Sequence, residues 1–215
     1  LMIVVLGRPR VYRPEPDGEL APGGLAVELA LAAARSGAHV ELVGAVGDDP
    51  EGDRIVIELG RAGVGHAALM RDPATRTPHV GQPRDARPLP RLEAADVELG
   101  LRYQAECRVL VIGAELDPAA LVAAQEAADF HGAAVVMVAS TGSVEPEALG
   151  AEVTLLERPA IEDAESVEDA VIVAANDAAF GAFVAEYAIR LDRGESPATA
   201  FSAALEASAW EPSLD

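Results

Sequence analysis

Residues 39–65 read HVELVGAVGDDPEGDRIVIELGRAGVG, which predicts a strand, a turn and a helix in immediate succession. Apolar residues dominate positions 39–46, as expected of a buried strand. Asp49 and Pro50 follow, a favoured N-cap residue and a proline suited to the first helical turn. We expect this helix to run to about Ala62, where glycines follow. A strand that leads through a tight turn into a helix is typical of α/β proteins.

The rest of the chain continues this alternation of strands and helices. Continuous apolar runs predict further buried strands at residues 2–6, 108–112, 133–139 and 152–156, and a short strand at 67–71. Helices are expected from Gly23-Gly24 to Gly37, from Asp117 to about Phe130, from Asn176 or Asp177 to Gly194, and from Ser196 to about Trp210. Residues 8–22 and 79–92 are expected to form flap or loop segments. The order predicts one α/β domain over residues 1–215, with a largely parallel sheet covered on both faces.

Charge and composition exclude several functions. The chain has 215 residues, and all 16 basic residues are arginine, against 36 acidic residues, so the net charge is −20. Without lysine there is neither a P-loop lysine nor a Schiff-base lysine. This acidity repels phosphate backbones and anionic lipids, so nucleic acid and membranes are not expected partners. No segment resembles a signal peptide or is apolar for long enough to predict a membrane helix.

Cysteine and histidine usage bears on compartment and metal binding. Cys107 is the single cysteine, which suits a reducing cytoplasm and a small buried side chain. The four histidines do not share the spacing of metal ligands, so no metal site is predicted. They are His39, His66, His79 and His131.

An ordered series of motifs resembles the PfkB, or ribokinase-like, carbohydrate kinase family. The series consists of Gly7, Gly23-Gly24, Ser36-Gly37-Ala38, Val43 to Asp49 with Gly52, Ala62-Gly63-Val64 and Thr77-Pro78, and later Gly181 to Val184 and Arg193 to Ser196. The resemblance implies a three-layer α/β/α sandwich with a mostly parallel central sheet and, in this short chain, a reduced lid. It also implies descent from enzymes that transfer the γ-phosphoryl group of ATP to a hydroxyl of a sugar or nucleoside.

The resemblance also identifies where the catalytic motif of the family should lie. Family members carry Gly-Ala-Gly-Asp ahead of Ala-Phe, where the glycines bind phosphate and the aspartate is the base. The positions that match this motif here are Ala178, Ala179, Phe180 and Gly181. Gly181 stands at the base position and has no carboxylate. Asp177 directly precedes these positions and has two interpretations. It is either a substitute for the missing base or the N-cap of the helix.

The substrate positions of the family have also diverged. Gly23 and Gly24 would let a sugar approach the start of a helix, or they serve the fold alone. Tyr12 aligns with the substrate-binding aspartate of the family, and Glu28 aligns with its asparagine. Between Ile161 and Ala178 the chain has no room for the strands and the glycine-rich loop that hold adenine in the family.

Three interpretations of function remain open at this point. The first is a degenerate sugar or nucleoside kinase homologue that keeps the fold and a small-molecule site but not phosphoryl transfer. The second is a minimal active kinase that uses Asp177 with ATP and Mg²⁺, with its site completed by a neighbouring subunit. The third is a noncatalytic interaction protein that forms a homodimer through sheet edges left exposed.

Overall fold

The computed structural model describes residues 2–81, 87–113, 116–141, 153–158, 164, 166–208 and 210. Six strands form one sheet in the order β5-β4-β1-β6-β7-β8, and every neighbouring pair in it is parallel. The strands are β1 (Met2–Leu6), β4 (Val40–Gly47), β5 (Leu69–Asp72), β6 (Cys107–Ile112), β7 (Ala134–Ser140) and β8 (Val153–Arg158). The mostly parallel sheet predicted from the sequence is confirmed.

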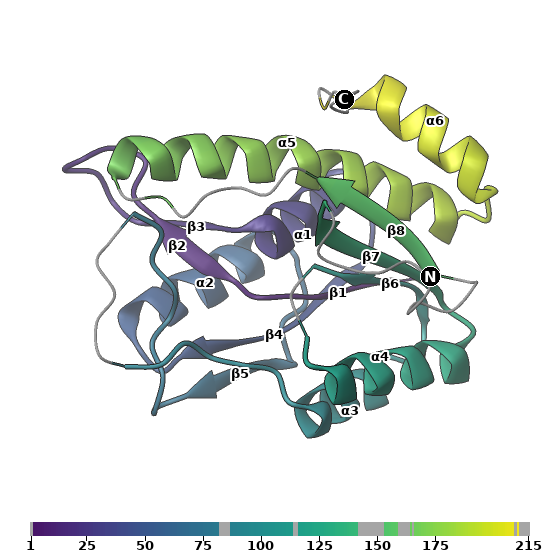
Figure 1. Ribbon diagram of the computed structural model, residues 1–215, viewed down its shortest axis with the longest axis horizontal. Coiled ribbons are helices and arrows are strands. Elements are labelled where there is room, and N and C mark those ends of the chain that lie inside the picture. The colour runs from purple at the N-terminus through teal and green to yellow at the C-terminus, as the bar shows by residue number, and fades with distance from the viewer. Residues whose placement is uncertain are drawn as a thin grey trace.

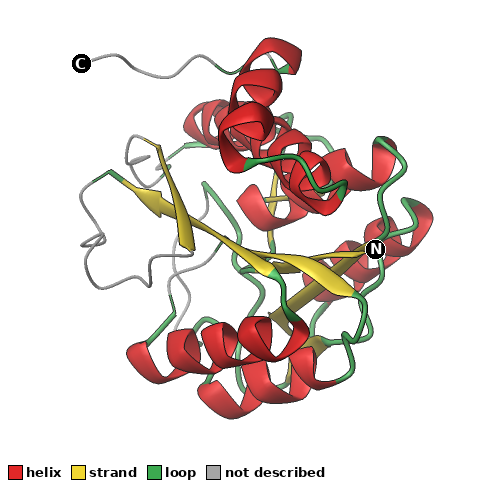
Figure 2. Ribbon diagram, turned by 90° about the vertical axis from the view of Figure 1, so that its right-hand side faces the viewer, coloured by secondary structure: helices red, strands yellow, loops and turns green. Residues whose placement is uncertain are grey.

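Helices cover both faces of this sheet, which makes three layers (Figures 1 and 2). The helices are α1 (Leu25–Arg35), α2 (Pro50–Arg61), α3 (Ala94–Arg102), α4 (Pro118–His131), α5 (Val167–Asp192) and α6 (Pro197–Ala207). Core residues of α1, α2, α5 and α6 share one cluster, and those of α3 and α4 belong to a second cluster. The helix over Ala94–Arg102 was not predicted from the sequence.

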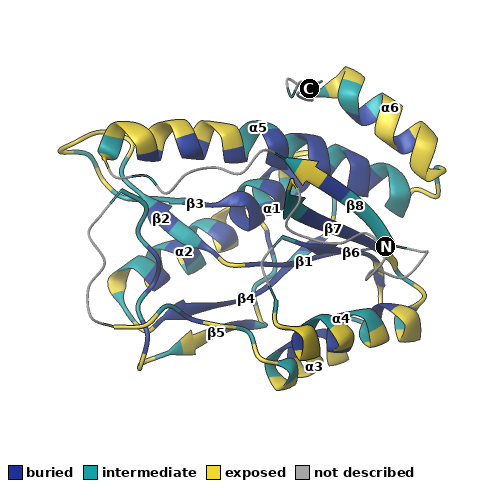
Figure 3. Ribbon diagram, viewed as in Figure 1, coloured by how far each residue is buried: buried dark blue, intermediate teal, exposed yellow. Residues whose placement is uncertain are grey.

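Strand β1 shows why its sequence is apolar at every position. Ile3 and Val5 point into the core under α1 and α5, whereas Met2, Val4 and Leu6 belong to the core on the other face. Successive side chains of a strand point to opposite faces, so a strand covered on both sides needs an unbroken apolar run. Figure 3 shows the buried sheet between helices whose outer surfaces are exposed.

Several helix ends lie where the sequence predicted them. Asp49 caps α2 and Asp117 caps α4, each through a side-chain oxygen that accepts a backbone N–H three residues further on. Gly37 after α1 and Gly132 after α4 have positive φ angles of 81° and 64°, a conformation that favours glycine.

Part of the expected flap is a small antiparallel sheet. Strands β2 (Arg10–Tyr12) and β3 (Ala21–Gly23) pair with each other within residues 8–22. His79 adds a bridge to Val11, so the segment after β5 lies beside the hairpin. At its other end, the hairpin leads directly into α1: β3 ends at Gly23, and α1 begins at Leu25.

Helix α5 differs from the prediction. Its N-cap is Ser166, which accepts a hydrogen bond from the Asp169 backbone, and the helix continues for 26 residues. The prediction of a helix that begins at Asn176 or Asp177 is wrong, because the capping box at Ser166 starts it about three turns earlier. The helix is long and apolar enough to cross a membrane by length and composition, but 61% of its most apolar window is buried in the structure, as in a core helix.

Candidate functional site

The hairpin, the start of α1 and the middle of α5 meet around the Gly23-Gly24 pair. A Cβ atom on Gly23 would lie 2.8 Å from Cδ1 of Tyr12, and one on Gly24 would lie 2.7 Å from Cγ of Arg10. Gly24 also has a φ of 87°, which favours glycine. The two glycines therefore make room for side chains of their own hairpin.

Asp177 lies at the centre of this region and is only 1% exposed. Its Oδ2 accepts a hydrogen bond from Arg10 Nη2 at 2.6 Å, and its Oδ1 accepts one from Arg158 Nη1 at 2.5 Å. The carboxylate thus ties β2 and β8 to α5. Because α5 begins at Ser166, Asp177 is an interior helix residue, and its interpretation as an N-cap is wrong.

Sequence reasoning did not identify Arg10 and Arg158, the two partners of Asp177. Each is a single arginine among 16, and no local pattern distinguishes it. The contacts join residues that are 167 and 19 positions apart, so only the packed sheet brings them together. The guanidinium carbon of Arg158 also lies 5.8 Å from the ring centroid of Phe180, within the range of a cation–π interaction.

Tyr12 and Glu28 complete the group of predicted substrate positions. Burial raises the pKa of Glu28; the positive charge of Arg35 opposes this, and the negative charge of Asp177 adds to the increase. Burial raises the pKa of Tyr12 as well, and the charge of Glu28 contributes further. Glu28 therefore lies within electrostatic reach of both Tyr12 and Asp177.

The positions that match the catalytic motif of the family lie inside α5. Ala178, Ala179, Phe180 and Gly181 are interior residues of the helix, in which backbone N–H groups bond to carbonyl oxygens one turn earlier. The expectation of a helix N-terminus at this motif is therefore wrong. Phe180 is 1% exposed, and its ring packs against Phe183 and Trp210.

Gly181 has a packing role in this structure. A Cβ atom there would lie 3.0 Å from the backbone nitrogen of Leu29 and 3.1 Å from Cβ of Glu28. Helices α1 and α5 thus approach each other closely at this glycine. A carboxylate at position 181 would be directed into α1 rather than toward a ligand.

The family resemblance implies Mg²⁺ and ATP, which residues of this region would have to hold. Phosphate binding at the motif needs backbone N–H groups that are not already bonded, and residues 178–181 lie in the helix interior. Within the described ranges there is no group of three or more His, Cys, Asp and Glu residues that could hold a metal ion. Residues 178–181 therefore lack the unbonded backbone N–H groups with which the family motif would bind phosphate.

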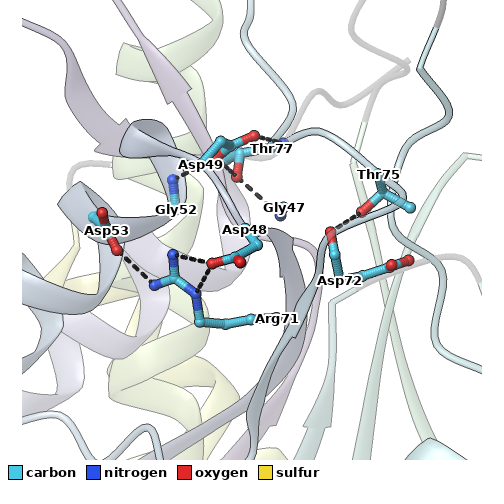
Figure 4. Close-up of polar contacts among 9 residues, drawn as sticks. All are labelled: Gly47, Asp48, Asp49, Gly52, Asp53, Arg71, Asp72, Thr75 and Thr77. Carbon is cyan, nitrogen blue, oxygen red and sulfur yellow. Dashed lines mark hydrogen bonds and ion pairs between the residues drawn. The ribbon is translucent and has the colours of Figure 1, made fainter.

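A second polar cluster surrounds the turn between β4 and α2 (Figure 4). Asp49 accepts hydrogen bonds from Gly52 N at 2.9 Å, Thr77 N at 2.8 Å and Thr77 Oγ1 at 2.6 Å. Gly47 N donates in turn to Thr77 Oγ1 at 3.0 Å. These bonds hold the segment after β5 against the start of α2, so Asp49 has the structural role expected for it.

Charged side chains at the edge of the same cluster are paired with one another. Arg71 contacts Asp48 at 3.0 Å and Asp53 at 2.7 Å. The cluster in Figure 4 therefore stabilises the turn and the adjacent strand β5.

Comparison with protein families identifies the class of protein that this fold defines. The model of the pfkB family carbohydrate kinases matches residues 6–157, which is more than half of the chain. The chain therefore belongs to the pfkB family of carbohydrate kinases. A search of curated protein sequences found no significant match.

Solved structures agree on the ribokinase-like fold. The crystal structure of Sa239 aligns with a TM-score of 0.69 at 15% identity, over 99% of this chain and 96% of that one. Arabidopsis thaliana ribokinase complexed with ribose and ATP aligns with a TM-score of 0.64 at 15% identity, over 94% and 89%. An uncharacterized sugar kinase from Pyrococcus horikoshii in complex with ATP aligns with a TM-score of 0.51 at 16% identity, over 67% and 54%, so the chain spans about half of that kinase.

Proposed function

We propose that this pfkB family protein binds a sugar or nucleoside and does not transfer a phosphoryl group to it efficiently. The observation that carries the proposal is the engagement of Asp177. Both of its carboxylate oxygens accept hydrogen bonds from arginines, and the side chain is 1% exposed. Ala178 to Gly181, the positions that match the catalytic motif of the family, carry no carboxylate.

A general base must lie within hydrogen-bond reach of the hydroxyl that it deprotonates. Asp177 is directed at Arg10 and Arg158, and these two ion pairs occupy both of its carboxylate oxygens. Stabilisation of the transferred phosphoryl group needs preorganised donors aimed at its oxygens. The backbone of residues 178–181 is committed to the helix, which supports a loss of this function.

The same region retains groups that suit a hydroxyl-bearing ligand. Tyr12 and Glu28 lie beside the Gly23-Gly24 turn, and each offers an oxygen that can hydrogen bond with a hydroxyl. The Arabidopsis neighbour is a ribokinase complexed with ribose and ATP. Together with family membership, this favours a sugar or nucleoside as the ligand here.

Two assays on the purified chain test the proposal. The first measures ADP release from Mg²⁺ and ATP in the presence of sugars and nucleosides, with an active ribokinase as positive control. The second measures the thermal shift produced by each sugar, nucleoside and nucleotide. We expect a shift from a sugar or nucleoside and no turnover above the rate without protein.

Sustained turnover would contradict the proposal and favour the minimal kinase. In that case Asp177→Asn decides which residue is the base. Loss of turnover, with the fold intact by circular dichroism, would assign the role to Asp177. Unchanged turnover would direct the search to another carboxylate. If no compound shifts the melting temperature, the protein is not a binder of these ligands, and the interaction hypothesis gains support.

A further inference from the structure

The C-terminal ends of α3 and α4 carry the two most exposed large apolar side chains of the described residues. Phe130 in the last turn of α4 is 85% exposed, and Tyr103, the C-cap of α3, is 77% exposed. The two helices lie side by side (Figure 1), and Nε2 of His131 lies 3.3 Å from the backbone oxygen of Leu101. The two aromatic residues therefore belong to one exposed surface, which we call the helix-end patch.

Two further apolar side chains extend the helix-end patch along the outer surfaces of the helices. Leu99 lies one turn before Tyr103 on α3, and Val122 lies two turns before Phe130 on α4. Both side chains are about half exposed. Residues spaced by four or eight positions share one broad face of a helix. Contiguous exposed apolar side chains of this kind mark protein–protein contact sites more often than isolated ones do.

Each of the two helices has a charged residue directly before its exposed aromatic residue, and the two charges are opposite. Arg102 precedes Tyr103, and Asp129 precedes Phe130. Both charged residues are exposed, and within the ranges that the structure describes neither has an ion-pair partner. In a dimer with a two-fold axis, every contact between two different residues occurs twice. If Arg102 of one copy faces Asp129 of the other, the symmetry therefore produces two ion pairs, and the neighbouring aromatic rings meet in the same way.

Asp129 lies at the end of its helix that disfavours a carboxylate. The C-terminal end of a helix carries a partial negative charge, which stabilises cations and destabilises anions. Asp129 is in the last turn of α4, where His131 is the basic residue. Glu126, which is also exposed, lies one turn before Phe130 and adds a second carboxylate. An arginine supplied by another molecule would therefore be favoured at this end of α4.

The apolar surface of the helix-end patch is sufficient for a specific dimer. A large aromatic side chain can bury about 150–250 Å², so the four rings of two copies supply roughly 600–1,000 Å². A specific interface needs about 1,000 Å² in total. Leu99, Val122 and the aliphatic stem of Arg102 add to the area of the rings.

We propose that the helix-end patch binds a second copy of this chain, with Arg102 of each copy against Asp129 of the other and the aromatic rings packed between them. The patch lies on the face of the sheet opposite to α5, the helix that carries Asp177, because α3 and α4 belong to the other core cluster. The dimer therefore does not depend on the ligand of that site. It uses helix surfaces and leaves the edge strands β5 and β8 out of the interface.

Sedimentation equilibrium of the full chain and of two charge-reversal variants tests this interface. The unmodified chain should sediment as a species of twice 22.2 kDa. Arg102→Asp should weaken the dimer about tenfold or more, because carboxylates then face each other at both symmetric contacts. Asp129→Arg should weaken it similarly, because guanidinium groups then face each other. Both positions are exposed, so each variant should keep the circular dichroism spectrum of the unmodified chain.

An equal mixture of the two variants assigns the contact to these residues. A dimer of one Arg102→Asp copy and one Asp129→Arg copy has opposite charges at both contacts, so the mixture should recover the dimer. The double variant Arg102→Asp/Asp129→Arg should recover it as well. A change within one folded chain cannot explain recovery on mixing two chains. A mixture that stays monomeric would overturn the proposal.

Arg193→Asp is the matched control, because Arg193 is likewise an exposed arginine at the C-terminal end of a helix, here α5. Its mass should remain that of the dimer. Phe130→Ser and Tyr103→Ser remove apolar surface without a change of charge and should shift the mass toward 22.2 kDa. A monomeric unmodified chain would overturn the proposal. A dimer that all of these variants leave unchanged would also overturn it and would favour pairing of sheet edges.

Discussion

Gly181 on α5 lies against Leu29 on α1, such that a Cβ atom at Gly181 would come within 3.0 Å of the Leu29 backbone nitrogen. This proximity explains the glycine by packing between two helices. It also means that the position matching the family's catalytic base faces the core.

Gly181→Asp, which restores the residue type of the family motif, should therefore destabilise the protein by about 2 kcal/mol or more. The added side chain meets backbone atoms of α1 and brings a charge beside Glu28. Urea unfolding measures the loss. Gly60→Asp on the exposed side of α2 is the control, with a change near zero, because its closest neighbour is a side-chain atom of His66 at 3.4 Å. Phosphotransferase activity in Gly181→Asp would contradict our account of this position.

Asp49→Ala should cost more stability than Asp117→Ala, although both remove the N-cap of a helix. Loss of a cap costs about 1 kcal/mol. Asp117 caps α4 through Ala120 N, whereas Asp49 also accepts two hydrogen bonds from Thr77. Urea unfolding of both variants checks the difference, and Asp49→Asn should retain part of the stability. Equal losses would show that the bonds from Thr77 contribute nothing.

The contribution of Asp49 to the free energy of unfolding should persist at neutral pH and disappear only in strong acid. Burial alone would raise the pKa of Asp49, but hydrogen bonds from Thr77 and Gly52 hold it below its ordinary value. Because the pKa of Asp49 is lower in the folded than in the unfolded chain, its ionised form stabilises the folded state at every pH above the unfolded-state pKa of about 3.9. This stabilisation is lost as the pH falls through the folded-state pKa. The stability difference between Asp49→Asn and the unmodified chain, measured from pH 7 to pH 2, should shrink only at the acidic end. A difference already lost at pH 5 would contradict this.

Glu28→Gln should raise the melting temperature at pH 7. Burial raises the pKa of Glu28, with Arg35 opposing and Asp177 adding, so ionised Glu28 disfavours the folded state. For a carboxylate with a raised pKa, stability increases as pH falls through the folded value, and the advantage of glutamine should vanish below about pH 4. Glu98→Gln, at an exposed position of α3, serves as the control. A lower melting temperature at pH 7 would contradict the prediction.

Cys107 should resist alkylation while the protein is folded. Burial raises the pKa of its thiol to about 11, and the side chain is almost inaccessible. Since the thiolate is the reactive form, iodoacetamide at pH 8 should react roughly 100-fold more slowly than with the chain in urea. Mass spectrometry of a time course measures both rates, and similar rates would show that the thiol is accessible.

Light scattering should give a mass of twice 22.2 kDa, the mass of a homodimer. Among the described strands of the six-stranded sheet, β5 and β8 each have a neighbour on one side only, and Phe130 and Tyr103 are 85% and 77% exposed. Natural proteins protect exposed strand edges, and pairing with a second copy of the chain is one way to do so. A monodisperse monomer would rule out this prediction.

The strands, most helix ends and the family could be predicted from the sequence, because these features depend on neighbouring residues. Apolar runs identified β1, β4, β6, β7 and β8, and the caps at Asp49 and Asp117 identified two helix starts. The start of α5 was mispredicted since Asp177 is a good cap by type, whereas the Ser166 capping box begins the helix earlier.

The sequence by itself determined a parallel α/β sheet, the turn after β4 and membership of the pfkB family, since residues close in the chain specify them. Only the tertiary structure decided the roles of Asp177 and Gly181. The partners of Asp177 lie 167 and 19 residues away in the sequence. Gly181 contacts Leu29 and Glu28 of α1, which lie far from it in the sequence. A carboxylate becomes a base, a cap or half of an ion pair according to its neighbours in space, which packing of the sheet and helices supplies.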